Sequence, residues 1–183
     1  MSVAAAPVWV FAYGSLLWRP GFAHDEVLDA YLRGYHRSLC VYSWVHRGTR
    51  DRPGLVLGLD RGGSCRGRAF AIAPDREAEV LRYLDARELV TKVYRRKRLE
   101  VITARGRLPA WCYVVRREHP QYAGRLDPPR VLELVRGGIG QSGHCRDYLL
   151  STVSHLEAMG IVDGPLHALA KALVEDCIEP AGS

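Results

Sequence analysis

The chain has 183 residues, of which 48% are hydrophobic and 25% charged, and its formal net charge is +6. These values fit one globular domain with a hydrophobic core, and no apolar run approaches the ~20 residues of a membrane-spanning helix. The N-terminus lacks the basic start and long apolar stretch of a signal peptide. We therefore expect one domain over residues 1–183, a flexible N-terminus at residues 1–7, and neither secretion nor a membrane partner.

The five cysteines are widely spaced and contain no C-x-x-C pair. They are Cys40, Cys65, Cys112, Cys145 and Cys177. An odd number at this spacing suits free thiols in a reducing compartment better than disulfides or a zinc site. The pattern predicts a cytoplasmic protein without a bound metal.

The predicted elements change character along the chain. Short apolar or β-branched stretches bounded by Gly, Pro or Asp predict strands at residues 8–12, 38–45, 55–59 and 66–72. The apolar spacing then becomes that of a helix over residues 75–87. Strands resume at residues 93–103 and 110–115, and the turn-prone residues 104–107 between them indicate a hairpin.

After a Pro-Pro pair at residues 128–129 the pattern becomes helical, with breaks at glycines. The expected helices cover residues 131–135, 146–159 and 167–177. One helix inserted among strands, with the other helices gathered at the C-terminal end, predicts an α+β fold with a mixed or antiparallel, barrel-like sheet rather than alternating βαβ units.

Two motif-like stretches do not support the chemistry they suggest. Residues 138–143 match G-x-G-x-x-G, but a dinucleotide site needs a preceding strand, and here a predicted helix precedes it. We interpret the stretch as a helix-to-helix turn. Ser15 lacks the G-x-S-x-G context of a serine nucleophile, and no His or Asp partner is indicated by spacing.

An apolar strand runs directly into the turn Tyr13-Gly14-Ser15-Leu16. Such a strand-to-glycine turn can present successive backbone N–H groups to an anion. The alternative is a plain turn in which Tyr13, Leu16 and Trp18 are core residues. The local sequence leaves both interpretations open.

Glu88 directly follows the predicted helix of residues 75–87. At ~100° per residue, Val80, Leu84, Glu88 and Leu81 fall at roughly 0°, 40°, 80° and 100°, so Glu88 extends an apolar stripe. A carboxylate in that position is either paired with a cation such as Arg87 or Arg95, or desolvated, which raises its pKa and suits proton transfer near neutral pH. Glu79 lies roughly 180° away and should point toward solvent or toward another layer of the fold.

Basic residues crowd together after this helix: Lys92, Arg95, Arg96, Lys97 and Arg98. A solvated strand face is one interpretation. The other is a nucleic-acid-binding surface, which predicts strongly salt-dependent binding of RNA or DNA. Charge alone does not choose between them, and we expect no nucleic-acid partner.

Four segments follow one another along the chain: Tyr13-Gly-Ser-Leu16 with Trp18-Arg-Pro20, His46-Arg-Gly-Thr49 with Pro53-Gly54, Tyr83-Leu-Asp-Ala-Arg-Glu88, and Ser142-Gly143 with Tyr148-Leu149. In this order they resemble the ChaC family of glutathione-specific γ-glutamylcyclotransferases. Each tetrapeptide is weak evidence alone, but four at compatible spacing over about residues 8–150 are specific. Residues 89–93 are longer and less glycine-rich than the matching part of eukaryotic members, and so are closer to the bacterial type.

The resemblance implies a γ-glutamylcyclotransferase-like fold and the conversion of glutathione into 5-oxoproline and Cys-Gly, with no cofactor and no metal. Glu88 is then the expected catalytic acid/base, with Glu79 in a supporting role at most. The expected substrate-binding residues are Phe11, Ala12, Tyr13, Gly14, Ser15, Leu16 and Tyr148. Arg47 would meet a substrate carboxylate or form a structural ion pair.

The resemblance leaves two other functions open. The same chemistry could act on another γ-glutamyl compound, because Glu88 and the turn would recognise only the shared head group. An inactive family member retained for protein interaction is the other alternative, and the intact Glu88 and Tyr13–Leu16 motif argue against it. The oligomeric state is not indicated by any pattern.

Overall fold

The computed structural model describes residues 6–175 of the chain. The chain divides into two compact units, each built from two segments. The first consists of Met1–Ser38 and Gly58–Pro120, and the second of Leu39–Leu57 and Gln121–Ser183. The expected flexible stretch at residues 1–7 falls largely outside the described residues, as does Cys177.

Within the described residues, the first unit is built on a closed barrel of strands in the order β1-β3-β2-β4-β5. Strand β1 (Val8–Ala12) pairs antiparallel with β3 (Gly54–Ile72) and parallel with β5 (Gly106–Val115). Strand β2 (Glu26–Ser43) pairs antiparallel with β4 (Tyr94–Thr103). The sheet is therefore mixed, and the predicted α+β organisation with a barrel-like sheet is confirmed.

The predicted bounds were wrong for three stretches, which belong to the two strands β2 and β3. The stretches 55–59 and 66–72 belong to one strand, β3, which continues through Gly62 and Gly63. Both glycines have positive φ angles, of 99° and 65°, so the chain twists there without leaving the sheet. Strand β2 begins at Glu26, twelve residues before the predicted start, because its first half alternates charged and apolar residues around Gly34 and lacks a continuous apolar run.

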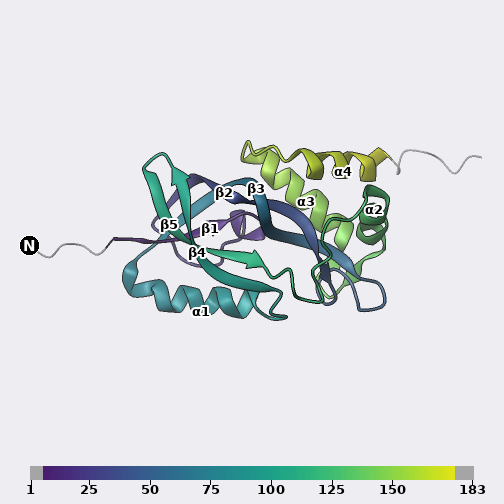
Figure 1. Ribbon diagram of the computed structural model, residues 1–183, viewed down its shortest axis with the longest axis horizontal. Coiled ribbons are helices and arrows are strands. Elements are labelled where there is room, and N and C mark those ends of the chain that lie inside the picture. The colour runs from purple at the N-terminus through teal and green to yellow at the C-terminus, as the bar shows by residue number, and fades with distance from the viewer. Residues whose placement is uncertain (1–5, 176–183) are drawn as a thin grey trace, which may run out of the picture. The chain divides into compact units, whose positions relative to one another are not determined.

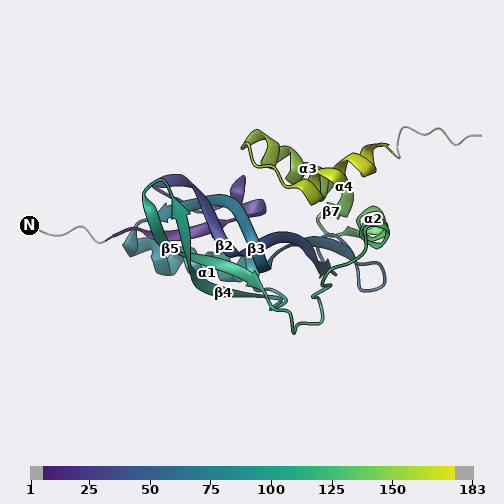
Figure 2. The same cartoon turned by 45° about the horizontal axis from the view of Figure 1, so that its top comes forward.

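The predicted helix and hairpin of the first unit are confirmed, and the second strand of the hairpin begins at Gly106 rather than at residue 110. A short 3₁₀ turn, η2 (Pro74–Arg76), leads into α1 (Glu77–Glu88), which has acidic residues in its first turn and Arg87 in its last, as the helix dipole favours. Strands β4 and β5 pair along their whole length. Figures 1 and 2 both show α1 lying beside this hairpin.

Up to residue 175, the second unit contains one end each of β2 and β3 together with three helices. These are α2 (Pro128–Gly137), α3 (Cys145–Ala158) and α4 (Gly164–Glu175), and α3 contacts both of the others. The G-x-G-x-x-G stretch forms a two-residue hairpin, β6 (Ile139–Gly140) and β7 (Gly143–His144), between α2 and α3. It therefore joins two helices, as predicted, and no strand of the described chain precedes it in the dinucleotide-binding manner.

Two further sequence expectations concern the cysteines and membrane-spanning segments. Of the cysteines in the described residues, Cys40, Cys65, Cys112 and Cys145 are all free thiols and all buried. No helix of the described chain is long and apolar enough to span a membrane.

Candidate active site

The motif Tyr13-Gly14-Ser15-Leu16 carries β1 into a short 3₁₀ helix, η1 (Ser15–Leu17). Its shape is fixed by backbone hydrogen bonds: Leu17 N–H donates to the Gly14 carbonyl (2.9 Å), and Arg19 N–H donates to the Ser15 carbonyl (2.9 Å). The N–H groups of a first helical turn have no acceptor inside the helix, and those of Ser15 and Leu16 have none among the other described residues. The turn therefore presents two adjacent donors.

The side chains around the turn are mostly buried. Phe11 and Ala12 are completely buried, and Tyr13 and Leu16 are 8% and 7% exposed. Phe11 and Ala12, the last two residues of β1, are therefore part of the core next to the turn. Gly14 and Ser15 are half-buried and are the more accessible members of the motif.

The start of the turn is held by Arg37 and Gly67. The buried Arg37 guanidinium donates to the carbonyls of Tyr13 and Arg66, both at 2.6 Å. A Cβ on Gly67 would overlap the Ala12 carbonyl and lie 2.9 Å from the Phe11 ring, so only glycine allows β3 to approach the end of β1 this closely. The end of β1 is thus held by a side-chain hydrogen bond and by a close backbone contact.

Helix α1 is anchored to the hairpin at both of its ends. Near the start, Trp111 Nε1 donates to Glu77 Oε1 (2.9 Å). Near the end, Asp85 accepts from Tyr113 Oη (2.7 Å) and from Arg96 Nη1 (2.6 Å). These contacts fix the position of the last helical turn, and they give one member of the basic cluster, Arg96, a structural partner.

Glu88 is the last residue of α1 and continues its buried face, as the helical projection predicts. Val80, Leu81 and Leu84 are at most 8% exposed, and the Glu88 side chain is 20% exposed. Desolvation raises the pKa of the Glu88 carboxyl above its ordinary value, and the neighbouring Arg87 charge opposes part of that rise. By contrast, the Glu79 side chain is 69% exposed and faces solvent, which is one of the two expected orientations.

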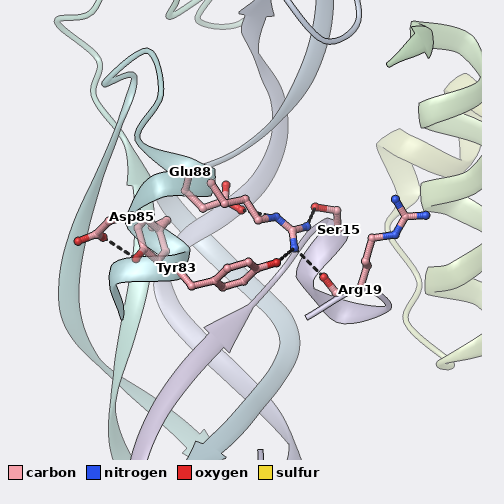
Figure 3. Close-up of polar contacts among 7 residues, drawn as sticks. Ser15, Arg19, Tyr83, Asp85 and Glu88 are labelled. Carbon is pink, nitrogen blue, oxygen red and sulfur yellow. Dashed lines mark hydrogen bonds and ion pairs between the residues drawn. The ribbon is translucent and has the colours of Figure 1, made fainter. Parts of the chain in front are cut away.

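Arg87 connects this carboxylate to the turn (Figure 3). Its Nε lies 3.3 Å from Glu88 Oε1, and its Nη2 donates to Ser15 Oγ at 2.9 Å. Its Nη1 donates to the Arg19 carbonyl at 2.8 Å and to Tyr83 Oη at 3.3 Å. The two interpretations of Glu88, paired or desolvated, therefore both apply: the carboxylate is mostly buried and has an arginine beside it.

Two of the other motifs meet in the second unit. The N–H groups of Gln141 and Ser142 donate to the carbonyls of Val45 and His46, at 2.8 and 2.9 Å. His46 Nδ1 also lies 3.0 Å from Ser142 Oγ. Residues 45–49 and 140–143, almost a hundred positions apart in the chain, thus form one loop cluster.

Comparison with known proteins decides the family. The model of the family described as ChaC-like protein matches residues 8–176. The chain belongs to the ChaC-like family. It is 30% identical to the glutathione-specific gamma-glutamylcyclotransferase of Escherichia coli over 89% of this chain and 71% of that one. It is 31% identical to glutathione-specific gamma-glutamylcyclotransferase 1 of Homo sapiens over 84% of this chain and 71% of that one.

The fold of this ChaC-like protein agrees with a solved structure. The yeast gamma-glutamyl cyclotransferase specific to glutathione superposes with a TM-score of 0.84, covering 93% of this chain and 97% of that one, at 21% sequence identity. The predicted γ-glutamylcyclotransferase-like fold is therefore confirmed.

The sequence-predicted site residues fall into two groups. The first unit brings together Glu88 and the segment Phe11–Leu16 through Arg87. Tyr148 belongs to the second unit, where its hydroxyl accepts from Leu57 N–H (3.2 Å) and its ring lies under the Arg47 guanidinium, 5.3 Å from ring centroid to Cζ. Arg47 donates to the carbonyls of Ser142 and His144, so in the structure it supports the loop cluster.

Sequence reasoning missed two arginines that hold the turn. Arg87 was considered only as a partner of Glu88, although its spacing of four from Tyr83 places the two side chains on one helix face. Arg37 carried no signal at all, because a single arginine between polar residues at the start of an expected strand looks like any exposed strand residue.

Proposed function

We propose that this protein is a glutathione-specific γ-glutamylcyclotransferase that converts glutathione into 5-oxoproline and Cys-Gly. The observation that carries the proposal is the mostly buried Glu88 carboxylate, with a raised pKa, linked through Arg87 to the Ser15 turn in a chain of the ChaC-like family. Relatives over most of the chain carry this activity in their names. The family match over residues 8–176 supports one functional domain that includes both units.

The reaction is an intramolecular displacement. The α-amino nitrogen of the γ-glutamyl group attacks its own γ-carbonyl carbon, so that a C–N bond closes the five-membered ring while the C–N bond to cysteine breaks. No electrons are transferred to or from another molecule, and no water is consumed. The enzyme must supply a proton acceptor, a proton donor, a fixed substrate conformer and stabilisation of the carbonyl oxygen.

Glu88 would serve as both acceptor and donor. Its carboxylate takes a proton from the substrate α-ammonium, which creates the nucleophile, and returns it to the departing cysteine nitrogen. Desolvation makes this carboxylate a stronger base than an exposed glutamate, because the raised pKa brings it closer to that of the ammonium. One carboxyl group is sufficient because the two transfers occur in sequence.

The turn would hold the γ-glutamyl head. The adjacent N–H groups of Ser15 and Leu16 are the candidates for stabilising negative charge on the γ-carbonyl oxygen as the ring closes. The buried residues Phe11, Ala12 and Tyr13 would support these groups, and Gly14, which has no side chain, would leave the backbone accessible to the substrate. We keep Tyr148 as a proposed contributor of a hydroxyl group.

The test is product formation by the purified protein. We expect 5-oxoproline and Cys-Gly from glutathione, with kcat/KM for γ-glutamyl-alanine at least ~10-fold lower if the cysteine and glycine residues of the substrate are recognised. Equal turnover of both compounds would mean that the enzyme acts on γ-glutamyl compounds in general and is not specific for glutathione. Failure to form 5-oxoproline from either compound would overturn the proposed reaction.

We place the reaction in the cytoplasm. The free, buried thiols of Cys40, Cys65, Cys112 and Cys145 suit a reducing compartment, which is also where glutathione is kept as the thiol. Subcellular fractionation of the source cells, with an antibody against the protein, tests this location.

A further inference from the structure

The Arg87 side chain joins helix α1 to the turn at Ser15 and to Arg19, just after the turn. Its guanidinium contacts the carboxylate of Glu88, the hydroxyl of Ser15 and the carbonyl of Arg19, and its Nη1 also reaches Tyr83 Oη. Each of its three nitrogens therefore has a partner in helix α1, in the turn or in the residues just after the turn. The side chain is 23% exposed, so solvent screens these contacts only in part.

We propose that Arg87 is a positioning residue that fixes the distance and orientation between the Glu88 carboxylate and the substrate-binding turn. The inference rests on the proposed function, because it assigns Arg87 a role in that reaction. Without Arg87, the carboxylate at the end of α1 and the Ser15 turn would lose their shared partner. The proton acceptor and the bound γ-glutamyl head would then move independently.

An arginine is required by this geometry. Its planar guanidinium carries five N–H donors in a fixed fork, which allows separate nitrogens to serve the carboxylate, the hydroxyl and the carbonyl. A lysine ammonium at the same place retains the positive charge but has one nitrogen at the end of a flexible chain. Lysine thus separates the contribution of charge from that of geometry.

The other contacts of the turn do not replace this function. Arg37 fixes the carbonyl of Tyr13, at the start of the turn, but touches neither Glu88 nor Ser15 in the described contacts. Tyr83 lies against Gly21, where an added Cβ would overlap its hydroxyl, and so supports the chain after the turn. Among the described residues, Arg87 is the side chain that contacts both Glu88 and Ser15.

The experiment compares Arg87→Met and Arg87→Lys with Arg82→Met. Arg82 lies on the same helix, is exposed, and has no part in the site, so it controls for loss of an arginine from α1. A misplacement of reacting groups by about 1 Å costs on the order of 10²-fold in rate. We expect Arg87→Met to lower kcat for glutathione by about that factor, Arg87→Lys to lower it by roughly 10-fold, and Arg82→Met to leave it unchanged.

The acid limb of the kcat/KM profile supplies a second readout. Within the described residues, Arg87 is the charged group that opposes the desolvation of Glu88. Arg87→Met should therefore move the acid limb to higher pH, whereas Arg87→Lys should leave it near the wild-type position. A side chain that only stabilised the fold would not move this limb.

A double-mutant cycle tests the link to the turn. If Arg87 acts through Ser15, Arg87→Met should have a smaller effect on kcat in a Ser15→Ala background than in the wild type. Amide hydrogen exchange, which needs no activity, should be at least ~10-fold faster at Leu17 and Arg19 in Arg87→Met than in Arg82→Met.

The outcomes distinguish this inference from the proposed function. If wild-type protein forms 5-oxoproline and folded Arg87→Met has unchanged kcat, or if its effect is fully additive with Ser15→Ala, the positioning role is overturned while the proposed function stands. If wild-type protein forms no 5-oxoproline from any γ-glutamyl compound, both fail. Should Arg87→Met not fold, a fully active Arg87→Lys variant would overturn the requirement for arginine geometry.

Discussion

The surroundings of Glu88 in the first unit and the loop cluster in the second unit both contain family motif residues, but they are stabilised in different ways. Around Glu88, side chains make the connections: Arg87 joins helix α1 to the turn, and Arg37 fixes the turn from below. In the loop cluster, backbones meet directly, and a Cβ on Gly140 would lie 2.5 Å from the Val45 carbonyl oxygen. Charged side chains can position a reacting group and also shift its pKa, whereas close contacts at a glycine only fix the backbone conformation.

This difference predicts different consequences of substitution. Changes in the Glu88 region should alter rate and pH dependence more than stability, because its polar groups are partly accessible and linked to the proposed chemistry. Changes at the glycines of the loop cluster should alter stability first, because backbone atoms cannot move aside without disturbing the strands and helices they belong to.

The largest expected effect is that of Glu88→Gln on activity. The amide keeps the shape of the side chain but cannot accept a proton, so formation of 5-oxoproline from glutathione should fall by about 10²–10⁴-fold. Far-UV circular dichroism should remain that of the wild type. Glu118→Gln, at an exposed position of the same unit, is the control and should retain full activity. Substantial turnover by Glu88→Gln would falsify the proposed mechanism.

Next in size is the effect of Gly140→Ala on stability. The added methyl group would lie within 2.5–2.6 Å of backbone atoms of Val45, His46 and Gly48, and overpacking of this kind typically costs about 1–3 kcal/mol. Urea unfolding measures the loss. Gly137→Ala is the matched control in the same segment, because its Cβ meets no atom within 4 Å. Equal stability of the two variants would contradict the close backbone approach.

A smaller effect is expected on the pH dependence of the free energy of unfolding. The pKa of the Glu88 carboxyl is raised in the folded protein, so between the ordinary value of 4.5 and the folded value the native state binds more protons than the unfolded state. The free energy of unfolding of the wild type should therefore fall as pH rises through this window, and Glu88→Gln should lack that contribution. Urea titrations at several pH values measure the difference.

The raised pKa of Glu88 also predicts how activity depends on pH. Because the proposed base must be deprotonated, kcat/KM should fall as pH is lowered through the raised pKa, at a higher pH than an exposed glutamate would give. An acid limb at or below pH 4.5 would argue against a desolvated Glu88 as the base.

The smallest effect is expected at Lys92, in the turn between Glu88 and β4. Its φ angle is +61°, which L-residues with a Cβ adopt at a cost of roughly 1–2 kcal/mol. Lys92→Gly removes that strain and adds backbone entropy to the unfolded chain, so we expect a net gain of up to ~1 kcal/mol in the free energy of unfolding. Lys92→Ala keeps the Cβ and should show no gain. Equal unfolding midpoints for the two variants would contradict backbone strain here.

The sequence by itself determined the strand β1, the helix α1, the hairpin β4–β5 and the inward direction of Glu88. These elements have continuous apolar patterns or regular helical spacing, and local pattern is sufficient to place them. It also indicated the family, because four motifs occurred in order. The first half of β2 and the middle of β3 were missed, because charged residues and a glycine pair interrupt the apolar pattern while the ladder continues.

Only the tertiary structure decided how Glu88 is held. The contacts of Arg87 with Ser15 and Arg19, and of Arg37 with Tyr13, join residues between 24 and 72 positions apart. The desolvation that raises the Glu88 pKa likewise depends on which segments cover the carboxylate. Periodicity along one helix predicts the direction of a side chain, but its charged partners and its exposure to water arise only when distant segments pack together.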